Sequence, residues 1–382
     1  MTPDVSTTVA GIRLSTCIYN ASGPRSGSAE ALHKIAQSSA GAVLSKSATL
    51  LAQDGNPLPR TWQHNDASLN SEGLPNKGID YYISDETISE ILQDSSSSKP
   101  YMVSLSGKTT ADNITMLRRM VGNTKIAAIE LNLACPNIIG KPVVGYDVEQ
   151  MKDILDQVTQ ILNLPPMGIK LPPYLDSVQF QQVATLINQY NWIQFVVSIN
   201  TLGNATAVSI EAGMPFISSN DGFAGLSGPA VKYTALANVR KLRQLLRPTI
   251  DVVGVGGIAT GRDVLEFLLC GAAAVQVGTQ HWSEGPKCFD RLVQELSDCM
   301  TELGHESVRS IVGTLQPWNK AGAAKLRALT KNLNVKPVES PSSEGGKEVF
   351  YQALSAVLLL IVFMLVYDKF TTNGAIAESR EL

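Results

Sequence analysis

The feature that most constrains the fold is a series of eight short, apolar and β-branched runs, most of them separated by helix-like stretches. The runs cover residues 17–22, 41–47, 101–107, 127–135, 167–171, 195–201, 251–257 and 274–279. The helix-like stretches include residues 111–121, 147–163, 177–190, 230–246 and 261–271. Eight strands that alternate with helices over about 300 residues predict an α/β fold of the (β/α)8 TIM-barrel type.

An open, doubly wound sheet is the alternative fold for this alternation. Such a sheet rarely contains eight runs, and the first run here is not followed by the G-x-G-x-x-G turn of dinucleotide-binding sheets. The gap between residues 48 and 100 is too long for one helix, so we expect it to contain an inserted strand pair or a lid.

Charge and cysteine content exclude several classes of function. The chain has 382 residues and a formal net charge of −3, which disfavours a nucleic-acid surface because that needs clustered basic residues. Its five cysteines include no C-x-x-C pair, and its four histidines include no H-x-x-x-H pair. We therefore expect no disulfide framework, no metal site and a reducing compartment.

The C-terminal region differs in composition from the rest of the chain. Residues 334–348 are rich in Pro, Ser and Gly and predict a flexible linker. Residues 349–367 contain no charge, and a helix of that length covers about 28 Å, close to the hydrocarbon thickness of a bilayer. We expect a single transmembrane helix here rather than a buried core helix, which would keep a polar stripe.

These segments predict the domain organisation. The expected parts are a barrel (1–314), a terminal helical extension (315–333), a linker (334–348), a transmembrane helix (349–367) and a short tail (368–382). Because the N-terminus lacks the basic and apolar regions of a secretory signal, we expect a membrane protein with a C-terminal anchor whose barrel faces the cytosol. The sequence leaves open which membrane this is.

Polar residues follow the predicted strands where a TIM barrel places its functional groups, at the carboxyl ends. These ends carry Ala21-Ser22, Lys46, Ser106, Asn132 with Cys135, Lys170, Asn200, Gly256-Gly257 and Gly278-Thr279. Because the carboxyl ends of barrel strands meet at one face, we expect two lysines, two amides, a thiol and two glycine turns to share a pocket.

The types of these residues indicate a chemistry. Glycine turns let backbone N–H groups approach a phosphate. Lysines neutralise an anion or an electron-rich ring, and amides suit the edges of a flat heterocycle. No acid pair and no histidine falls at a strand end, so the thiol is better suited to proton abstraction beside a hydride-accepting cofactor than to nucleophilic attack.

Ordered motifs give the chain a resemblance to a known family. They include "SKSATL" (45–50), "GLPNKGIDYY" (73–82), "ELNLACPNIIGKP" (130–142), "GIKLPPYLD" (168–176) and "GVGGIATGRD" (254–263). With these motifs the chain resembles the class 1A, fumarate-reducing dihydroorotate dehydrogenases over roughly residues 10–314. The resemblance implies an FMN-containing, homodimeric enzyme of pyrimidine (UMP) biosynthesis that oxidises dihydroorotate to orotate and passes the electrons to fumarate.

The resemblance also implies roles for individual residues. Cys135 is expected to be the base that removes the C5 proton while hydride leaves C6 for the flavin. The expected substrate-binding residues are Lys46, Asn70, Gly73, Leu74, Asn76, Asn132, Asn137, Asn200 and Thr201. The expected FMN-binding residues are Ala21, Ser22, Lys46, Ser47, Asn132, Lys170, Gly225, Gly256, Gly257, Gly278 and Thr279.

Three features depart from the family pattern. Glu72 stands where methionine is usual, and Thr201 stands where serine is usual. The third feature is the predicted membrane segment, which the soluble class lacks. A flavin enzyme for another reduced pyrimidine and a quinone-linked dihydroorotate dehydrogenase are therefore alternatives. A third is a membrane-tethered scaffold that has lost activity, but the intact thiol, lysines and amides weigh against it.

Overall fold

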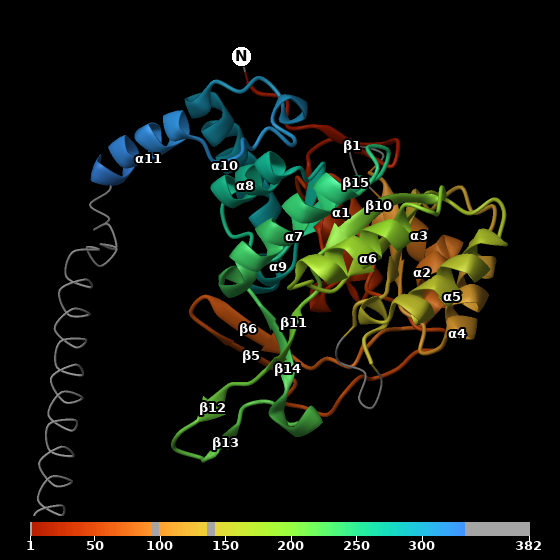
Figure 1. Ribbon diagram of the computed structural model, residues 1–382. Helices are drawn as coiled ribbons and strands as arrows, with labels where there is room; N and C mark the ends of the chain where they lie inside the picture. Colours follow the sequence, from red (N-terminus) through yellow and green to blue (C-terminus); the bar gives the residue numbers. More distant parts are fainter. Residues whose placement is uncertain (1, 94–98, 136–141, 333–382) are drawn as a thin grey trace, which may run out of the picture. The chain divides into compact units, whose positions relative to one another are not determined.

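The eight predicted strands form one parallel sheet in the computed structural model, which describes residues 2–93, 99–135 and 142–332 (Figure 1). The order of strands in the sheet is β3-β16-β15-β10-β9-β8-β7-β4. Their bounds are β3 (Ile18–Asn20), β4 (Val43–Leu44), β7 (Tyr101–Leu105), β8 (Ala128–Asn132), β9 (Met167–Leu171), β10 (Ile193–Ser198), β15 (Asp251–Val255) and β16 (Ala274–Val277).

A side chain joins the two end strands of this sheet, β3 and β4. The Asn20 amide nitrogen donates to the carbonyl oxygen of Leu44 at 2.7 Å, and its amide oxygen accepts from the Leu44 N–H at 2.9 Å. Asn20 is fully buried, so it supplies the hydrogen bonds that a neighbouring backbone would make. The nearly closed parallel sheet confirms the predicted TIM barrel and excludes the open doubly wound sheet.

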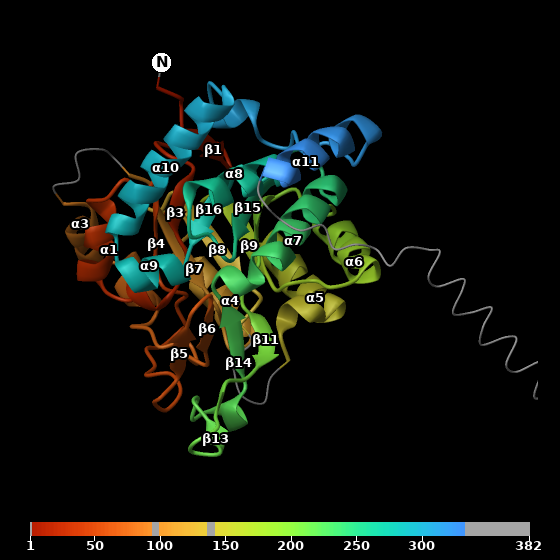
Figure 2. The same ribbon diagram turned by 90° about the vertical axis from the view of Figure 1, so that its left-hand side faces the viewer.

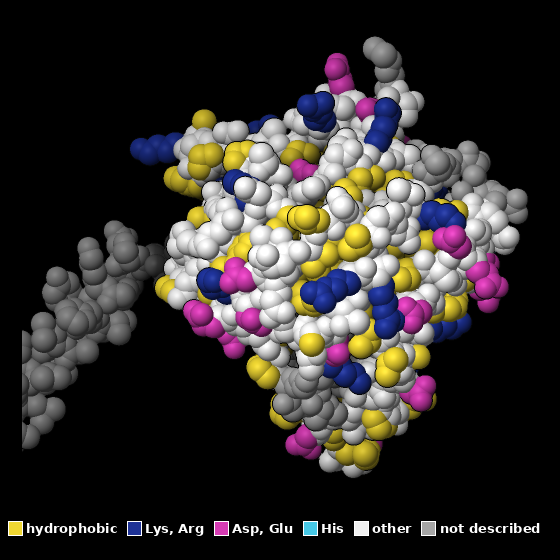
Figure 3. Space-filling view, turned by 90° about the vertical axis from the view of Figure 1, so that its right-hand side faces the viewer, with side chains coloured by type: hydrophobic (Ala, Val, Ile, Leu, Met, Phe, Trp, Pro, Cys, Tyr) yellow, Lys and Arg dark blue, Asp and Glu magenta, His cyan; other side chains and the backbone are white. Residues whose placement is uncertain are grey.

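Helices surround the barrel strands, as Figure 2 shows. Their bounds are α1 (Ala29–Ala36), α2 (Ile79–Ile83), α3 (Asp85–Leu92), α4 (Thr110–Arg119), α5 (Val148–Thr159), α6 (Ser177–Ile187), α7 (Lys232–Leu245), α8 (Gly261–Cys270), α9 (Thr279–Glu284) and α10 (Lys287–Leu303). Capping boxes start α4 at Thr109 and α8 at Thr260. On the face in Figure 3, positive and negative side chains are interspersed with hydrophobic ones.

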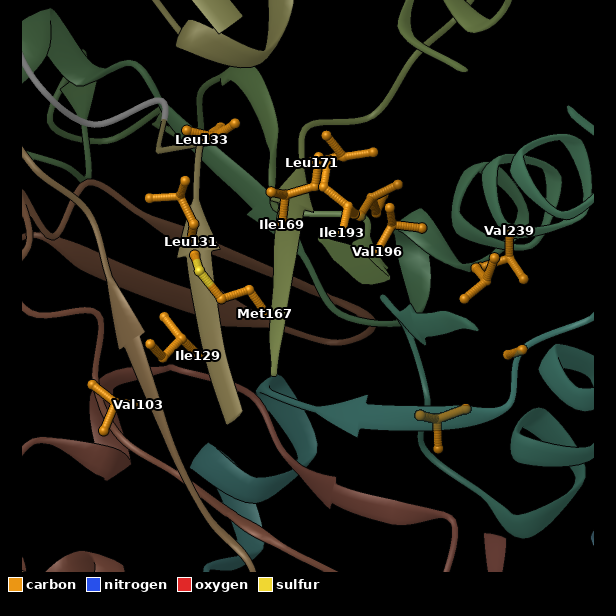
Figure 4. Close-up of a cluster of buried hydrophobic side chains, with 14 of the residues drawn as sticks. Val103, Ile129, Leu131, Leu133, Met167, Ile169, Leu171, Ile193, Val196 and Val239 are labelled. Carbon is orange, nitrogen blue, oxygen red and sulfur yellow. The ribbon is translucent and has the colours of Figure 1, made fainter. Parts of the chain in front are cut away.

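Alternation along the strands separates the apolar core from the barrel interior. In β8, Ile129 and Leu131 belong to the apolar cluster between sheet and helices, shown in Figure 4. The residues between and beyond them, Glu130 and Asn132, are also buried but belong to no apolar cluster. Because successive side chains point to opposite faces of a strand, Glu130 and Asn132 point into the barrel.

The lower part of the barrel interior is filled by a second apolar cluster, which includes Tyr19, Met102 and Phe195. Glycine makes room for one of these side chains, because a Cβ atom on Gly168 would lie 2.4 Å from the Phe195 ring. Above this layer the interior is polar, and the pocket lies there.

Smaller sheets come from long connections of the barrel. A four-stranded antiparallel sheet has the order β11-β14-β6-β5, with bounds β5 (Thr61–His64), β6 (Ala67–Asn70), β11 (Leu202–Ala205) and β14 (Ala224–Ser227). The remaining strands form the hairpins β1 (Thr7–Val9) with β2 (Ile12–Leu14) and β12 (Val208–Ser209) with β13 (Met214–Pro215). Strands β5 and β6 confirm the strand pair expected between residues 48 and 100. Since β5 follows β4 and β11 follows β10, the four-stranded sheet lies at the carboxyl ends of the barrel strands (Figure 1).

The chain divides into two units, Met1–Leu315 and Gln316–Leu382. In the second unit the structure describes helix α11 (Lys320–Asn332). The part of the chain that the structure describes contains no helix both long enough and apolar enough to cross a bilayer, which corrects the predicted membrane localisation. The predicted linker, transmembrane helix and tail (334–382) lie outside the described residues, and the predicted domain boundaries stay predictions.

Candidate active site

A pocket opens at the carboxyl ends of the barrel strands and encloses about 1170 Å³ of space, part of it open to solvent. It brings together most of the residues selected from the sequence. These are Ala21, Ser22, Lys46, Ser47, Asn70, Leu74, Asn132, Cys135, Lys170, Asn200, Thr201, Gly256, Gly257, Gly278 and Thr279. They come from the ends of seven barrel strands, from strand β6 of the four-stranded sheet and from the loop that follows β6, so only the folded barrel assembles them.

Three residues predicted to bind substrate or FMN do not line the pocket, and neither does Ser106 at the end of β7. The Asn76 amide accepts from the backbone of Thr49 and Gly78 and donates to the Thr49 hydroxyl and the Leu74 carbonyl. These bonds occupy both ends of the amide, so Asn76 shapes the loop, and its expected contact with substrate stays a prediction. Gly73 likewise shapes this loop with a φ of +68°.

Gly225 is the third of these residues, and its position explains why a glycine is needed. A Cβ atom there would lie 2.1 Å from Oγ1 of Thr201. Gly225 therefore leaves room for the Thr201 hydroxyl rather than lining the pocket. The remaining predicted residue, Asn137, lies outside the described residues.

Amide side chains form a connected series along one side of the pocket. The Asn200 amide nitrogen donates to Oδ1 of Asn132 at 3.2 Å, and the Asn132 amide nitrogen donates to Oγ of Ser47 at 3.1 Å. Oγ1 of Thr201 is buried beside them and has no hydrogen-bond partner among the described residues. Buried polar atoms normally have partners, so this hydroxyl is suited to contact a bound molecule.

Two loops place a pair of opposite charges at the pocket: Glu72 lines it, and Arg60 lies close to Glu72 but is not one of the lining residues. The guanidinium Nε of Arg60 lies 3.5 Å from a carboxylate oxygen of Glu72, and we call these two residues the wall pair. Arg60 also donates to the carbonyl oxygens of Asp54 and Asn56. Glu72 is only 8% exposed and lines the pocket, so its carboxylate does not turn out to solvent.

Lys46 brings a second positive charge to this wall. It is 5% exposed, and burial lowers the pKa of its ammonium group, while the nearby charges of Glu72 and Cys135 act in the opposite direction. Its position in the same pocket as Cys135 suits it to hold an anion beside the thiol.

Glycines form the opposite end of the pocket. Gly256 and Gly257 have φ values of +130° and +78°, which place them in conformations that other residues rarely adopt. Helix α9 begins directly after Gly278 without a side-chain cap. The backbone N–H groups of such a start need partners, and a phosphate can provide them.

Four residues form the lower boundary of the pocket, which we call the floor network: Ser104, Glu130, Lys170 and Gln276. Of these, the sequence analysis identified only Lys170. Lys170 donates to Oε1 of Gln276 at 3.3 Å and lies 3.8 Å from a carboxylate oxygen of Glu130. The Gln276 amide nitrogen donates to the other Glu130 oxygen at 2.6 Å, and the Ser104 hydroxyl donates to Glu130 at 3.3 Å. All four residues are at most 5% exposed. The buried polar positions Ser104 on β7, Glu130 on β8 and Gln276 on β16 were the signal that could have revealed the other three.

Comparison with known proteins agrees with this geometry. A family model described as "Dihydroorotate dehydrogenase" matches residues 4–300. The "Dihydroorotate dehydrogenase A (fumarate)" of Lactococcus lactis subsp. cremoris (strain MG1363) is 39% identical over 312 residues, which cover 82% of this chain and 99% of the relative. The chain belongs to the dihydroorotate dehydrogenase family.

Other members of the dihydroorotate dehydrogenase family show the same relationship. The "Dihydroorotate dehydrogenase (fumarate)" of Lachancea kluyveri is 41% identical over 296 residues, covering 78% of this chain and 93% of that one. A crystal structure of the Eimeria tenella enzyme in complex with ferulenol has a TM-score of 0.66 at 18% identity, covering 81% of this chain and 88% of the other. The latter likeness shows the shared fold. Family membership makes this chain a flavin-dependent oxidoreductase.

Proposed function

We propose that this chain oxidises dihydroorotate to orotate in pyrimidine biosynthesis, with FMN as its flavin and fumarate as the final electron acceptor. The pocket fits this reaction because it combines a thiol, two buried lysines and a series of amides with glycine turns at the opposite end. The buried Thr201 hydroxyl, which has no partner among the described residues, is a further sign that a bound molecule completes this site.

The residues divide between two halves of the pocket. The thiolate of Cys135 removes the C5 proton of dihydroorotate, while Lys46 and the amides of Asn132 and Asn200 bind the carboxylate and the ring edges. FMN, when bound, accepts the hydride that leaves C6. The residues that would hold FMN are Ala21, Ser22, Lys46, Ser47, Asn132, Lys170, Gly256, Gly257, Gly278 and Thr279. Lys170 lines the pocket and would supply a positive charge that stabilises the reduced, anionic ring.

The observation that carries the proposal is that Cys135, Lys46 and Lys170 line one pocket. We expect the purified protein to bind FMN and to lose its yellow colour when dihydroorotate is added without oxygen. Added fumarate should then restore the colour. A protein that cannot take up FMN, or whose flavin stays oxidised with dihydroorotate, would contradict the proposal.

Glu72 motivates one alternative, a flavin enzyme for a different reduced pyrimidine. Its carboxylate lines the pocket, where it disfavours an anionic substrate, but Arg60 lies close enough to offset that charge. The alternative predicts faster turnover of the uncharged dihydrouracil than of dihydroorotate. The proposed function predicts the reverse order.

We also propose that the chain forms a homodimer through the β12–β13 hairpin and its surroundings. Ile210 is 90% exposed, and Met214, Phe216 and Phe223 nearby are exposed as well. Exposed apolar residues grouped in this way are typical of interaction sites. Replacing Ile210 with Asp should shift the sedimentation coefficient to that of a monomer, whereas an unchanged coefficient would argue against this surface.

A further inference from the structure

Glu130 and Lys170 form a deeply buried pair of opposite charges in the barrel, and the proposed chemistry gives Glu130 no role. Glu130 is 1% exposed and is not one of the described residues that line the pocket. Its partners Lys170 and Gln276 do line the pocket. A carboxylate therefore lies directly beneath a pocket-lining ammonium group. Burying an ion pair is costly, so the pair needs an explanation beyond stability.

Glu130 holds Lys170 in place through two routes. The carboxylate attracts the ammonium group directly across 3.8 Å. It also accepts from the Gln276 amide nitrogen at 2.6 Å, which leaves the Gln276 oxygen to accept from Lys170 at 3.3 Å. This arrangement fixes which end of the Gln276 amide faces Lys170, and thereby the position of the ammonium group.

Hydrogen bonds also connect Glu130 with the substrate-binding amides. The Ser104 hydroxyl donates to Glu130, and its oxygen lies 2.9 Å from that of Ser47, which in turn accepts from Asn132 at 3.1 Å. The carboxylate is thus the buried centre of a network that reaches both halves of the pocket.

We propose that Glu130 is a positioning residue that orients Lys170 and offsets part of its positive charge, and so sets the midpoint potential of the bound flavin lower than Lys170 alone would. This inference rests on the proposed function, because it requires FMN beside Lys170. A positive charge favours the flavin that has gained electrons, and a carboxylate within 4 Å of that charge weakens this preference. A lower potential makes it easier to pass the electrons on to an acceptor.

Redox titration of the FMN-loaded protein, without any substrate, tests the inference. Glu130→Gln removes the charge and keeps the size of the side chain, so the midpoint potential should become more positive. We expect at least a tenfold change in the reduction equilibrium, about 30 mV for a two-electron couple. The matched control is Glu30→Gln, which breaks an exposed Glu–Lys pair on α1 (2.6 Å to Lys34) and should leave the potential unchanged.

An unchanged potential in a folded, FMN-loaded Glu130→Gln variant would overturn the inference and leave Glu130 a purely structural role. If that variant does not fold, Lys170→Gln is compared with the double variant Lys170→Gln/Glu130→Gln. The double variant should have the higher potential, and equal potentials would overturn the inference. A parent protein that binds no FMN would instead refute the proposed function.

Discussion

The floor network and the wall pair bury opposite charges in different ways. In the floor, the side chains of Glu130 and Lys170 are 1% and 6% exposed and stand on adjacent barrel strands. In the wall, those of Glu72 and Arg60 are 11% and 21% exposed and stand on loops outside the barrel. The strands fix the floor residues through backbone ladders, while the wall depends on contacts within a long connection. A wall of this kind can change its charge without disturbing the barrel.

The largest expected effect concerns Cys135, which lines the pocket and carries the proposed chemistry. Replacing Cys135 with Ser should slow flavin reduction by dihydroorotate at neutral pH by about 10²- to 10⁴-fold, because a hydroxyl is a far weaker base than a thiolate. Anaerobic stopped-flow absorbance measures this rate. The thermal unfolding midpoint and FMN binding should match those of the parent, since Cys135 lies beyond the end of β8. A serine variant that reduces its flavin at the parental rate would show that Cys135 is not the base.

The second prediction separates floor from wall by stability. Lys170→Met leaves the Glu130 carboxylate buried without its cation, which should lower the free energy of unfolding by about 3–5 kcal/mol. The matched variant Arg60→Ala breaks the more exposed wall pair and should cost only about 1 kcal/mol. Urea unfolding followed by circular dichroism measures both. Equal costs for the two variants would refute the distinction between floor and wall.

The third prediction concerns a buried histidine at the glycine-rich end of the pocket. Unlike the floor and wall pairs, this titratable group is buried in its neutral form. His281 on α9 is 3% exposed, and burial, followed by the nearby charge of Arg25, lowers its pKa from 6.5 to about 4. The unfolded chain therefore binds a proton below pH 6.5 that the folded chain binds only near pH 4. Stability present above pH 6.5 is lost as the pH falls through this window, by about 2 kcal/mol between pH 6.5 and pH 5.

The variant His281→Phe should remove most of this acid sensitivity, because the phenylalanine ring does not titrate. Unfolding free energies at pH 7 and pH 5 should then differ less in the variant than in the parent. The comparison uses the pH dependence rather than the absolute stability, so a packing defect near Phe289, the ring that contacts His281, does not affect the conclusion. The same pH dependence in both proteins would show that His281 is not the responsible group.

The contrast between floor and wall also explains what the sequence could predict. Residues at strand ends, such as Lys170 and Cys135, were located correctly because eight regular strands determine where their ends meet. Glu130 and Gln276 were not recognised as a network, since the sequence does not show which inward-pointing residues of distant strands lie at the same height. The sequence also does not show that the Asn76 amide bonds the backbone of Thr49 and Gly78, because these bonds depend on the loop conformation.

The smallest expected effect concerns the charge of the wall. Glu72→Met removes a carboxylate that lines the pocket and leaves Arg60 without that partner, so the local charge becomes more positive and orotate should bind more tightly. The gain in binding free energy should be about 1 kcal/mol or less, roughly a fivefold lower dissociation constant, because the pair is partly screened by solvent.

Titration of orotate against flavin absorbance at low and high salt measures this gain. Glu72→Gln serves as the variant that removes the charge and keeps a polar group. Since salt screens exposed charges, the gain should shrink as salt is raised. An orotate affinity equal to the parent's at both salt concentrations would show that the charge of Glu72 does not act on the substrate.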